Sequence, residues 1–210
     1  MIYLSGKWTR ILADAQKQGY PVGMLCQPNY PEPPAKQVTW AADTGIFGTV
    51  PFSLDRYLYK LEKWSSCLEA CAFATAPDVV ADWPGTLQKS LPVIPAIKQL
   101  GYPVALVLQD GATSQTVPWH LLDAVFVGGT TRWKLSEAAY RLVAEANERN
   151  LWTHMGRVNS LRRLHAAVAA GYNSADGTYV AYGPDTNSQH LLAWLDNLIL
   201  QPSMALVGRV

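Results

Sequence analysis

The sequence has almost no excess charge of either sign. Its 17 lysine and arginine residues are balanced by 16 aspartate and glutamate residues, which leaves a formal net charge of +1 at pH 7. A protein that covers a long stretch of nucleic acid needs a broad basic surface, because contacts to the phosphates supply much of the binding free energy. The composition therefore excludes an extensive nucleic-acid footprint and leaves room only for a local contact.

Long apolar runs and a cysteine framework are also missing. No stretch of about eighteen apolar residues occurs, so the sequence predicts no transmembrane helix and no membrane partner. The N-terminus lacks the basic start and apolar core of a secretory signal peptide. The three cysteines (Cys26, Cys67 and Cys71) are an odd number without disulfide spacing or paired ligands, so we expect a cytoplasmic protein with no metal and no cofactor.

Apolar residues, by contrast, are plentiful and follow a repeating order. They make up 49% of the 210-residue chain, enough for the core of a single domain over residues 1–210. Short β-rich runs alternate with helical segments or loops. Several runs, such as Val104–Gln109 and Ala124–Gly128, are continuously apolar, as parallel strands covered on both faces must be.

The expected strands are Ile2–Ser5, Pro21–Gln27, Val38–Asp43, Ala72–Ala76, Val104–Gln109, Ala124–Gly128, Trp152–Val158 and Tyr172–Asp176. The clearest expected helices are Trp8–Gln18, Leu54–Leu68, Ser136–Arg149, Ser160–Ala170 and Ser188–Leu200. This alternation predicts a compact (β/α)8 TIM barrel, near the lower end of the size range of that fold. A doubly wound open sheet is the main competitor, but its Gly-rich first turn is not matched by Gly6-Lys7 alone.

Residues that could bind a ligand or take part in a reaction follow the ends of the expected strands. They are Asn29, Asp43, Phe47, Asp82, Gln109, Gly128, Gly129, Met155, Gly156 and Asp176. In a barrel the carboxyl ends of the strands meet at one rim, where the active site is assembled. We therefore expect these residues to converge.

The expected rim carries carboxylates without a metal-binding pattern of histidine or cysteine. Asp43, Asp82 and Asp176 indicate chemistry at a sugar carbon, where one carboxylate acts as nucleophile and another as acid or base. Phe47 and Met155 are suited to holding a planar ring between them. Gln109 and the glycine backbone would then supply hydrogen bonds to the edges of that ring.

Five short motifs carry a family resemblance. They are Asp43-Thr44-Gly45-Ile46-Phe47-Gly48, Leu108-Gln109-Asp110-Gly111, Val127-Gly128-Gly129, His154-Met155-Gly156-Arg157 and Ala175-Asp176-Gly177. In this order and spacing they resemble motifs of the tRNA-guanine transglycosylase superfamily, most closely its small DNA-modifying branch in phages and bacteria. Val79–Pro84 is a looser match to another family motif, and the resemblance extends from about Leu25 to Thr178.

The resemblance implies a two-step base exchange. Asp176 would attack C1′ of a guanine nucleotide flipped out of DNA, and Asp43 would act as general acid and base. A free 7-deazaguanine base, of the 7-cyano (preQ0) type, would then displace Asp176. Phe47 and Met155 would stack on the two faces of the base. The other implied base contacts are Asp82, Gln109, Gly128, Gly129, Gly156 and Asn29.

The sequence departs from that family in two ways. Its structural zinc site, a Cys-x-Cys-x2-Cys with a distant histidine after the nucleophile, has no counterpart, so the expected fold is a barrel without the zinc-binding insertion. The Arg-rich segment that follows the nucleophile in tRNA enzymes is also missing, which favours DNA as the partner. The expected nucleic-acid contacts are Arg132, Lys134, Arg157, Arg162 and Arg163, in the host cytoplasm if the protein is phage-encoded.

Three other functions remain open from the sequence. One is base exchange on tRNA rather than DNA. Another is a hydrolytic N-glycosidase that uses the same rim. The third is a non-catalytic barrel that serves an active partner subunit, although the joint presence of Asp43 and Asp176 argues against it.

Overall fold

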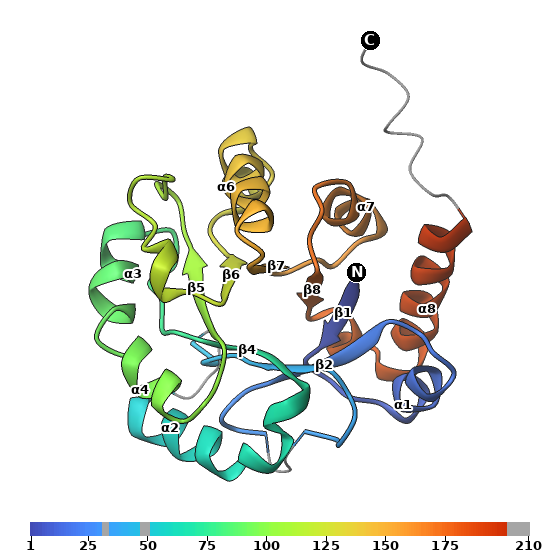
Figure 1. The fold of residues 1–210 in the computed structure, drawn as a ribbon. Helices are drawn as coiled ribbons and strands as arrows, with labels where there is room; N and C mark the ends of the chain where they lie inside the picture. Colours follow the sequence, from blue (N-terminus) through green and yellow to red (C-terminus); the bar gives the residue numbers. More distant parts are fainter. Residues whose placement is uncertain (31–33, 47–50, 201–210) are drawn as a thin grey trace.

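The computed structural model describes residues 1–30, 34–46 and 51–200. Within these residues, eight parallel strands form a closed barrel in the order of the chain, from β1 to β8 (Figure 1). The barrel closes because β1 pairs with β8, with Leu4 opposite Asp176. Closure confirms the predicted (β/α)8 barrel and excludes the open doubly wound sheet, whose edge strands would stay unpaired.

The strands are short and agree with the expected runs. They are β1 (Ile2–Ser5), β2 (Val22–Cys26), β3 (Trp40–Ala42), β4 (Cys71–Thr75), β5 (Val104–Leu108), β6 (Ala124–Val127), β7 (Trp152–Met155) and β8 (Ser174–Gly177). Since every strand is covered by the interior on one side and by helices on the other, the continuously apolar runs are explained. Several expected strands were too long because their last residues belong to loops rather than to the sheet.

Helices follow the strands around the outside of the barrel (Figure 1). They are α1 (Arg10–Lys17), α2 (Leu54–Lys63), α3 (Trp83–Ser90), α4 (Ile94–Gln99), α5 (Thr131–Lys134), α6 (Glu137–Glu148), α7 (Leu161–Ala169) and α8 (Pro184–Leu200), with 3₁₀ helices η1 (Ser65–Ala70), η2 (Trp119–Leu121) and η3 (Tyr179–Tyr182). None of the helices in the described part of the chain is long and apolar enough to cross a membrane.

One predicted helix is interrupted, and three short ones were not predicted. The run Leu54–Leu68 ends its α-helix at Lys63 and continues as η1. The helices α3 and α4 both lie between β4 and β5, and α5 follows β6 after a short loop. Both α3 and α4 have a proline in their first turn. Proline there lacks an N–H that the helix would leave unpaired anyway, so it starts these helices rather than breaking them.

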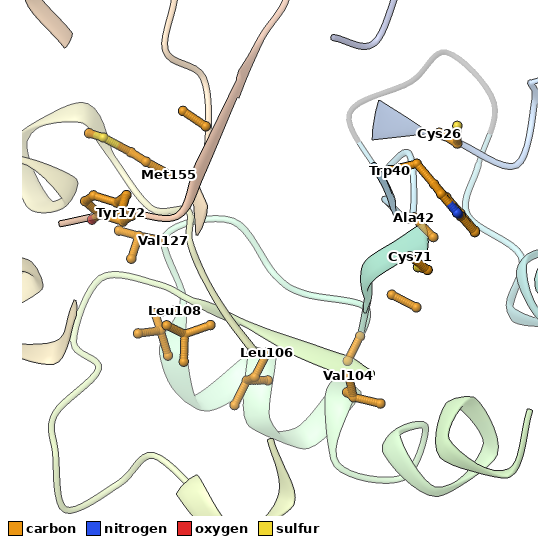
Figure 2. Packing of buried hydrophobic residues seen from close by; sticks show 14 of the residues in the cluster. Cys26, Trp40, Ala42, Cys71, Val104, Leu106, Leu108, Val127, Met155 and Tyr172 are labelled. Carbon is orange, nitrogen blue, oxygen red and sulfur yellow. The ribbon is translucent and has the colours of Figure 1, made fainter. Parts of the chain in front are cut away.

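Alternation along each strand separates two apolar clusters. The barrel interior holds the smaller one, made of Leu4, Leu25, Ala41, Phe73, Ala105 and Ala124 with Phe126 and Trp152 packed against it. The larger cluster lies between the strands and the helices and includes Trp40, Leu106, Val127, Met155 and Tyr172 (Figure 2). Because side chains alternate with a period of two, each strand sends one parity of residues to each cluster.

Candidate active site

A cavity of about 500 Å³ opens at the carboxyl ends of the strands. Its apolar wall is formed by Leu25, Val107 and Phe126. Carboxylate and amide side chains also line it, namely those of Gln27, Asn29, Asp43, Asp78, Gln109 and Asp176. The basic residues are Lys7 and Arg157, and the glycines include Gly128, Gly129 and Gly156. This is the face on which barrel enzymes keep their active sites, and the volume suits a small-molecule ligand.

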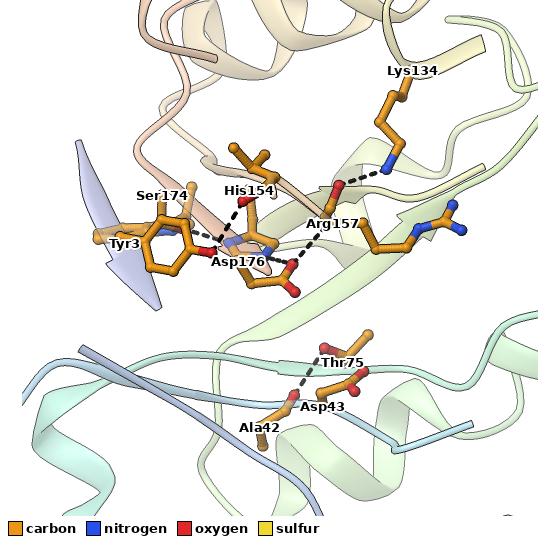
Figure 3. A network of polar contacts seen from close by, with 12 residues as sticks. Tyr3, Ala42, Asp43, Thr75, Lys134, His154, Arg157, Ser174 and Asp176 are labelled. Atoms are coloured by element: carbon orange, nitrogen blue, oxygen red, sulfur yellow. Dashed lines mark hydrogen bonds and ion pairs between the residues drawn. The ribbon is translucent and has the colours of Figure 1, made fainter. Parts of the chain in front are cut away.

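Asp176 lies at the end of β8 and is held by one of its two oxygens. Its Oδ1 lies 3.0 Å from His154 Nε2 and accepts a hydrogen bond from the backbone N–H of Arg157 at 3.2 Å (Figure 3). No hydrogen bond from another described residue reaches Oδ2. Since the side chain is 12% exposed and the residue lines the cavity, the carboxylate is fixed on one side and accessible to a ligand on the other.

His154 is itself oriented by a buried chain of hydrogen bonds. Trp152 donates its Nε1–H to Ser174 Oγ at 2.7 Å, and Ser174 Oγ lies 2.8 Å from His154 Nδ1. If Ser174 donates its hydroxyl proton to Nδ1, the neutral imidazole carries its proton on Nε2 and donates it to Asp176. In that tautomer His154 points an N–H at the carboxylate.

Asp43 follows β3 and faces the same cavity from the opposite side of the barrel. Gln27 Nε2 donates to Asp43 Oδ2 at 2.9 Å, and the backbone N–H of Gly45 reaches the same oxygen at 3.3 Å. Burial of the carboxyl group raises the pKa of Asp43 to about 6, although the hydrogen bond from Gln27 opposes this effect. The nearby carboxylates of Asp176 and Asp78 raise it further. A carboxyl group that titrates near neutral pH can both donate and accept a proton.

A second carboxylate–amide pair lies across the ends of β4 and β5. Gln109 Nε2 donates to Asp78 Oδ2 at 2.6 Å, and Gln109 Oε1 accepts the backbone N–H groups of Ala81 and Gly129 at 2.9 and 2.8 Å. Burial raises the pKa of Asp78 above its ordinary value. Because Gln109 is engaged with the protein at both ends of its amide, its main effect is to hold Asp78 in the wall of the cavity.

Beside Asp176 and Asp43, six more of the predicted site residues line the cavity: Gln109, Gly128, Gly129, Gly156, Asn29 and Arg157. Phe47 lies outside the described residues. Gly129 has a positive φ of 66°, which places its amide toward Gln109 and favours glycine at this position.

Two predicted site residues lie elsewhere. Met155 is fully buried and packs in the outer cluster with Val127 and Tyr172, because its parity in β7 is opposite to that of His154 (Figure 2). Asp82 is exposed and caps α3, where its Oδ1 accepts the backbone N–H of Gly85 at 3.0 Å. The expected contacts of Met155 with a ring and of Asp82 with a base edge are therefore not formed by the cavity.

The basic residues predicted to contact nucleic acid have different environments. Arg132 on α5 and Arg162 on α7 are exposed, whereas Arg163 is partly buried and donates from Nη1 to the Arg157 carbonyl at 3.2 Å. Arg157 also donates to the carbonyl of Gly129. Lys134 is 1% exposed and donates from Nζ to the Gly156 carbonyl at 2.5 Å. Lys134 is thus an internal group and not a surface contact for phosphate.

Sequence reasoning missed Lys7, Gln27, Asp78 and His154. Asp78 and Gln27 follow the ends of strands, as the predicted site residues do, so their position in the sequence could have indicated that they line the cavity. His154 shares its strand parity with Gly156, but Met155, of the opposite parity, was chosen as well, so the alternation along β7 did not single out His154. Among the described residues, no group of three or more His, Cys, Asp or Glu side chains is arranged to hold a metal ion.

Comparison with known proteins identifies a fold and no family. No family model matches the sequence, and no curated protein matches it. Among solved structures, one titled "Native KDPGal structure" is similar, with a TM-score of 0.55 and 11% sequence identity over 95% of this chain and 93% of that chain. At this level of identity the likeness shows the barrel fold alone.

The comparison corrects the predicted function. The motifs led us to expect guanine exchange in nucleic acid, but the similar structure reported above is titled for KDPGal and represents a different family of barrels. No family model or curated protein supports a transglycosylase. The prediction of guanine transglycosylation is therefore wrong, and the site has to be interpreted from its own geometry.

Proposed function

We propose that this chain is an enzyme that performs acid–base chemistry on a small, planar nitrogen heterocycle. The observation that carries the proposal is the meeting of Asp43, Asp78 and Asp176 around one cavity with an apolar floor. These carboxylates come from three different parts of the barrel, and each is held by its own hydrogen-bond partner. An arrangement of this kind fixes acceptors in space before a ligand arrives.

The ligand class follows from the polarity of the wall. Carboxylates accept hydrogen bonds, so they favour a ligand that presents several N–H donors along its edges. The floor formed by Leu25, Val107 and Phe126 favours a flat apolar face. A guanine-like base, with a ring N–H beside an amino group, has both properties, and a free 7-deazaguanine remains a proposed ligand on these grounds.

The two carboxylates that differ most in environment take different roles. Asp43, with its pKa raised to about 6, is the proton-transfer group, because it changes protonation within the physiological range. Asp176 is the anchored carboxylate: with Oδ1 occupied, it presents Oδ2 to the ligand. Asp78 is the recognition group, held toward the cavity by Gln109.

A binding experiment with 7-deazaguanine as the probe tests this assignment. We expect calorimetry at pH 7 to show binding to the wild-type protein and at least a tenfold loss of affinity in Asp78→Asn. Asp82→Asn is the matched control, since Asp82 is another aspartate of the same loop but lies outside the cavity, and asparagine preserves its helix cap. Equal affinity of both variants would remove Asp78 from the ligand site.

The same probe tests the proton-transfer role. A ligand that donates an N–H to ionised Asp43 binds more weakly once that carboxylate is protonated, so affinity should fall as the pH drops below about 6. The fall approaches tenfold per pH unit at its steepest. In Asp43→Asn this dependence should disappear. A wild-type affinity that is independent of pH from 5 to 8 would contradict the proposed role of Asp43.

An aldol-type reaction on a small carbonyl compound is the second candidate. It is favoured by the fold similarity to the KDPGal structure together with Lys7, which lines the cavity and offers an amine. An amine that attacks a carbonyl forms a Schiff base, which sodium borohydride reduces to a stable adduct. Incubation with pyruvate and borohydride, followed by peptide mass spectrometry, should locate such an adduct on Lys7. Absence of any adduct under these conditions eliminates this candidate.

DNA as a partner is a separate proposal, supported by exposed arginines on the helices that follow β6 and β7. Arg132 and Arg162 are the exposed members of the predicted set. We expect weak binding of a short single-stranded oligonucleotide in fluorescence anisotropy, weakened further by the double replacement of both arginines with glutamine. A local contact of about two phosphates predicts a shallow salt dependence, with a slope of log affinity against log salt of roughly −1.5.

A further inference from the structure

Lys134 is a buried lysine that forms no ion pair with a carboxylate of the described residues. It ends α5, the short helix after β6, and only 1% of it is exposed. Its Nζ donates to the backbone carbonyl of Gly156, which follows β7, at 2.5 Å. Burying an ammonium group costs free energy unless the group gains strong contacts, so a lysine used in this way calls for a physical explanation.

The explanation lies in the other end of the same peptide group. The carbonyl of Gly156 and the N–H of Arg157 belong to one peptide unit, and that N–H donates to Asp176 Oδ1 at 3.2 Å. The C–N bond of a peptide has partial double-bond character, so a cation at the oxygen draws electron density away from the nitrogen. The N–H then becomes a stronger donor, as expected for hydrogen bonds linked in a chain.

The backbone at this point is held in an uncommon conformation. Arg157 has a positive φ of 60°, in the left-handed region that non-glycine residues rarely adopt. The carbonyl of Arg157 accepts a hydrogen bond from Arg163, and its guanidinium donates to the Gly129 carbonyl. These contacts, together with Lys134, keep the Gly156–Arg157 peptide aimed at the carboxylate of Asp176 (Figure 3).

We propose that Lys134 is a positioning residue that polarises the Gly156–Arg157 peptide and, through it, fixes the Oδ1 atom of Asp176. The inference rests on the proposed function in one respect, since it gives Asp176 the catalytic task. Lys134 itself does not line the cavity, so it acts without touching the ligand. The arrangement places the positive charge behind the carboxylate while Oδ2 stays directed at the cavity.

The charged groups that face Lys134 make this device sensitive to pH. Burial lowers the pKa of Lys134 to about 8, the positive charges of Arg157 and Arg163 lower it too, and the negative charge of Asp176 raises it. The ammonium group, and with it the polarisation of the peptide, is therefore present below about pH 8 and is lost above it.

The backbone amide of Arg157 reports on this effect without any substrate. Nitrogen-15 labelling of arginine gives few amide resonances, and the one that disappears in Arg157→Lys identifies the residue. We expect the wild-type amide proton to move upfield with a midpoint near pH 8, as the hydrogen bond to Asp176 weakens. In Lys134→Met the transition should vanish and the resonance should stay at its high-pH position.

Two further variants separate positioning from support of the fold. Lys134→Arg keeps a positive charge at every pH, so its amide resonance should stay near the low-pH position and show no transition. Lys98→Met is the control, because Lys98 is a surface lysine paired with Asp123 at 3.3 Å, and the wild-type transition should persist there.

The outcome is distinct from that of the ligand experiments. A wild-type Arg157 resonance that does not move between pH 7 and 9 would overturn the proposal, and so would an unchanged transition in folded Lys134→Met. If Lys134→Met fails to fold, the wild-type titration and the Lys134→Arg variant still test the proposal, because the first must show the transition and the second must lack it. Absence of 7-deazaguanine binding would refute the proposed function and leave this measurement intact.

Discussion

Replacing Asp43 with asparagine should stabilise the protein at neutral pH. The carboxyl group has a pKa of about 6 in the folded protein, against a value of 3.8 for the unperturbed group. Between these two values the unfolded chain loses its proton while the folded chain keeps it, so stability falls as pH rises. Above about pH 6 the folded protein bears the full cost of burying the ionised carboxylate. This cost lowers the free energy of unfolding by about 3 kcal/mol at pH 7.

Asparagine is a suitable replacement because the site can accept it without a change of shape. Both hydrogen bonds to the carboxylate, from Gln27 and from the Gly45 amide, end on Oδ2, and a carbonyl oxygen can take that position. The gain should therefore approach about 3 kcal/mol at pH 7 and shrink to about 1 kcal/mol at pH 4.5, where most of the folded and some of the unfolded carboxyls are protonated.

Urea denaturation of both proteins at the two pH values measures this difference. Asp55→Asn is the control, because Asp55 is exposed in the first turn of α2 and should change stability by only a few tenths of a kcal/mol at either pH. A stabilisation by Asp43→Asn that is equal at pH 4.5 and pH 7 would refute the reasoning. So would destabilisation at pH 7, since it would mean that the ionised carboxylate contributes favourably to the fold.

Two further predictions concern the neighbouring groups. His154→Phe should destabilise the protein by about 1–3 kcal/mol in chemical denaturation, because it removes the side-chain donor of a buried carboxylate and leaves only the Arg157 amide, and the loss should largely disappear in the Asp176→Asn background. Gly129→Ala should cost at least about 1 kcal/mol, since φ is +66° and a Cβ would lie 2.7 Å from the Trp133 ring. Gly6→Ala, with no atom within 4 Å of its Cβ, is the control and should be near neutral. Additive losses in the first case, or equal melting temperatures in the second, would contradict these expectations.

The barrel itself could be predicted because its strands are covered on both faces. That coverage makes runs such as Val104–Leu108 continuously apolar, and the interruptions between them mark the crossovers. The convergence of Asp43 and Asp176 at one rim followed from the same argument, because parallel strands end at the same face. Both conclusions needed only the order of segments and no exact strand boundary.

Strand parity was harder to obtain from the sequence. In β7 (Trp152–Met155) both parities carry a large side chain, so composition alone does not show which side faces inward. The sheet decides this through register, because Phe126 pairs with His154 and Val127 with Met155 across β6 and β7. A shift of one residue would exchange the two sides. Met155 was chosen for its soft side chain and its place in a family-like motif, neither of which takes this register into account.

The choice between Asp78 and Asp82 illustrates a local signal that was present. Asp82 is followed by Trp83 and Pro84, and an aspartate just before a proline in a first helical turn is typical of a helix N-cap. An aspartate engaged in capping turns its carboxylate to the backbone of its own helix. Asp78 lies in the loop between β4 and α3, before the cap of α3, and it is the aspartate of this loop that lines the cavity.

Lys134 shows where local patterns stop being informative. Arg132 and Lys134 stand two positions apart in a polar segment, and their composition is that of a solvated basic surface. The two side chains lie in different environments because α5 turns Arg132 outward and directs Lys134 toward the end of the neighbouring strand β7. That contact spans 22 residues and depends on the pairing of β6 with β7, which no propensity within the segment encodes. A buried lysine therefore becomes visible only when the barrel closes, and its partner then identifies the peptide through which it reaches Asp176.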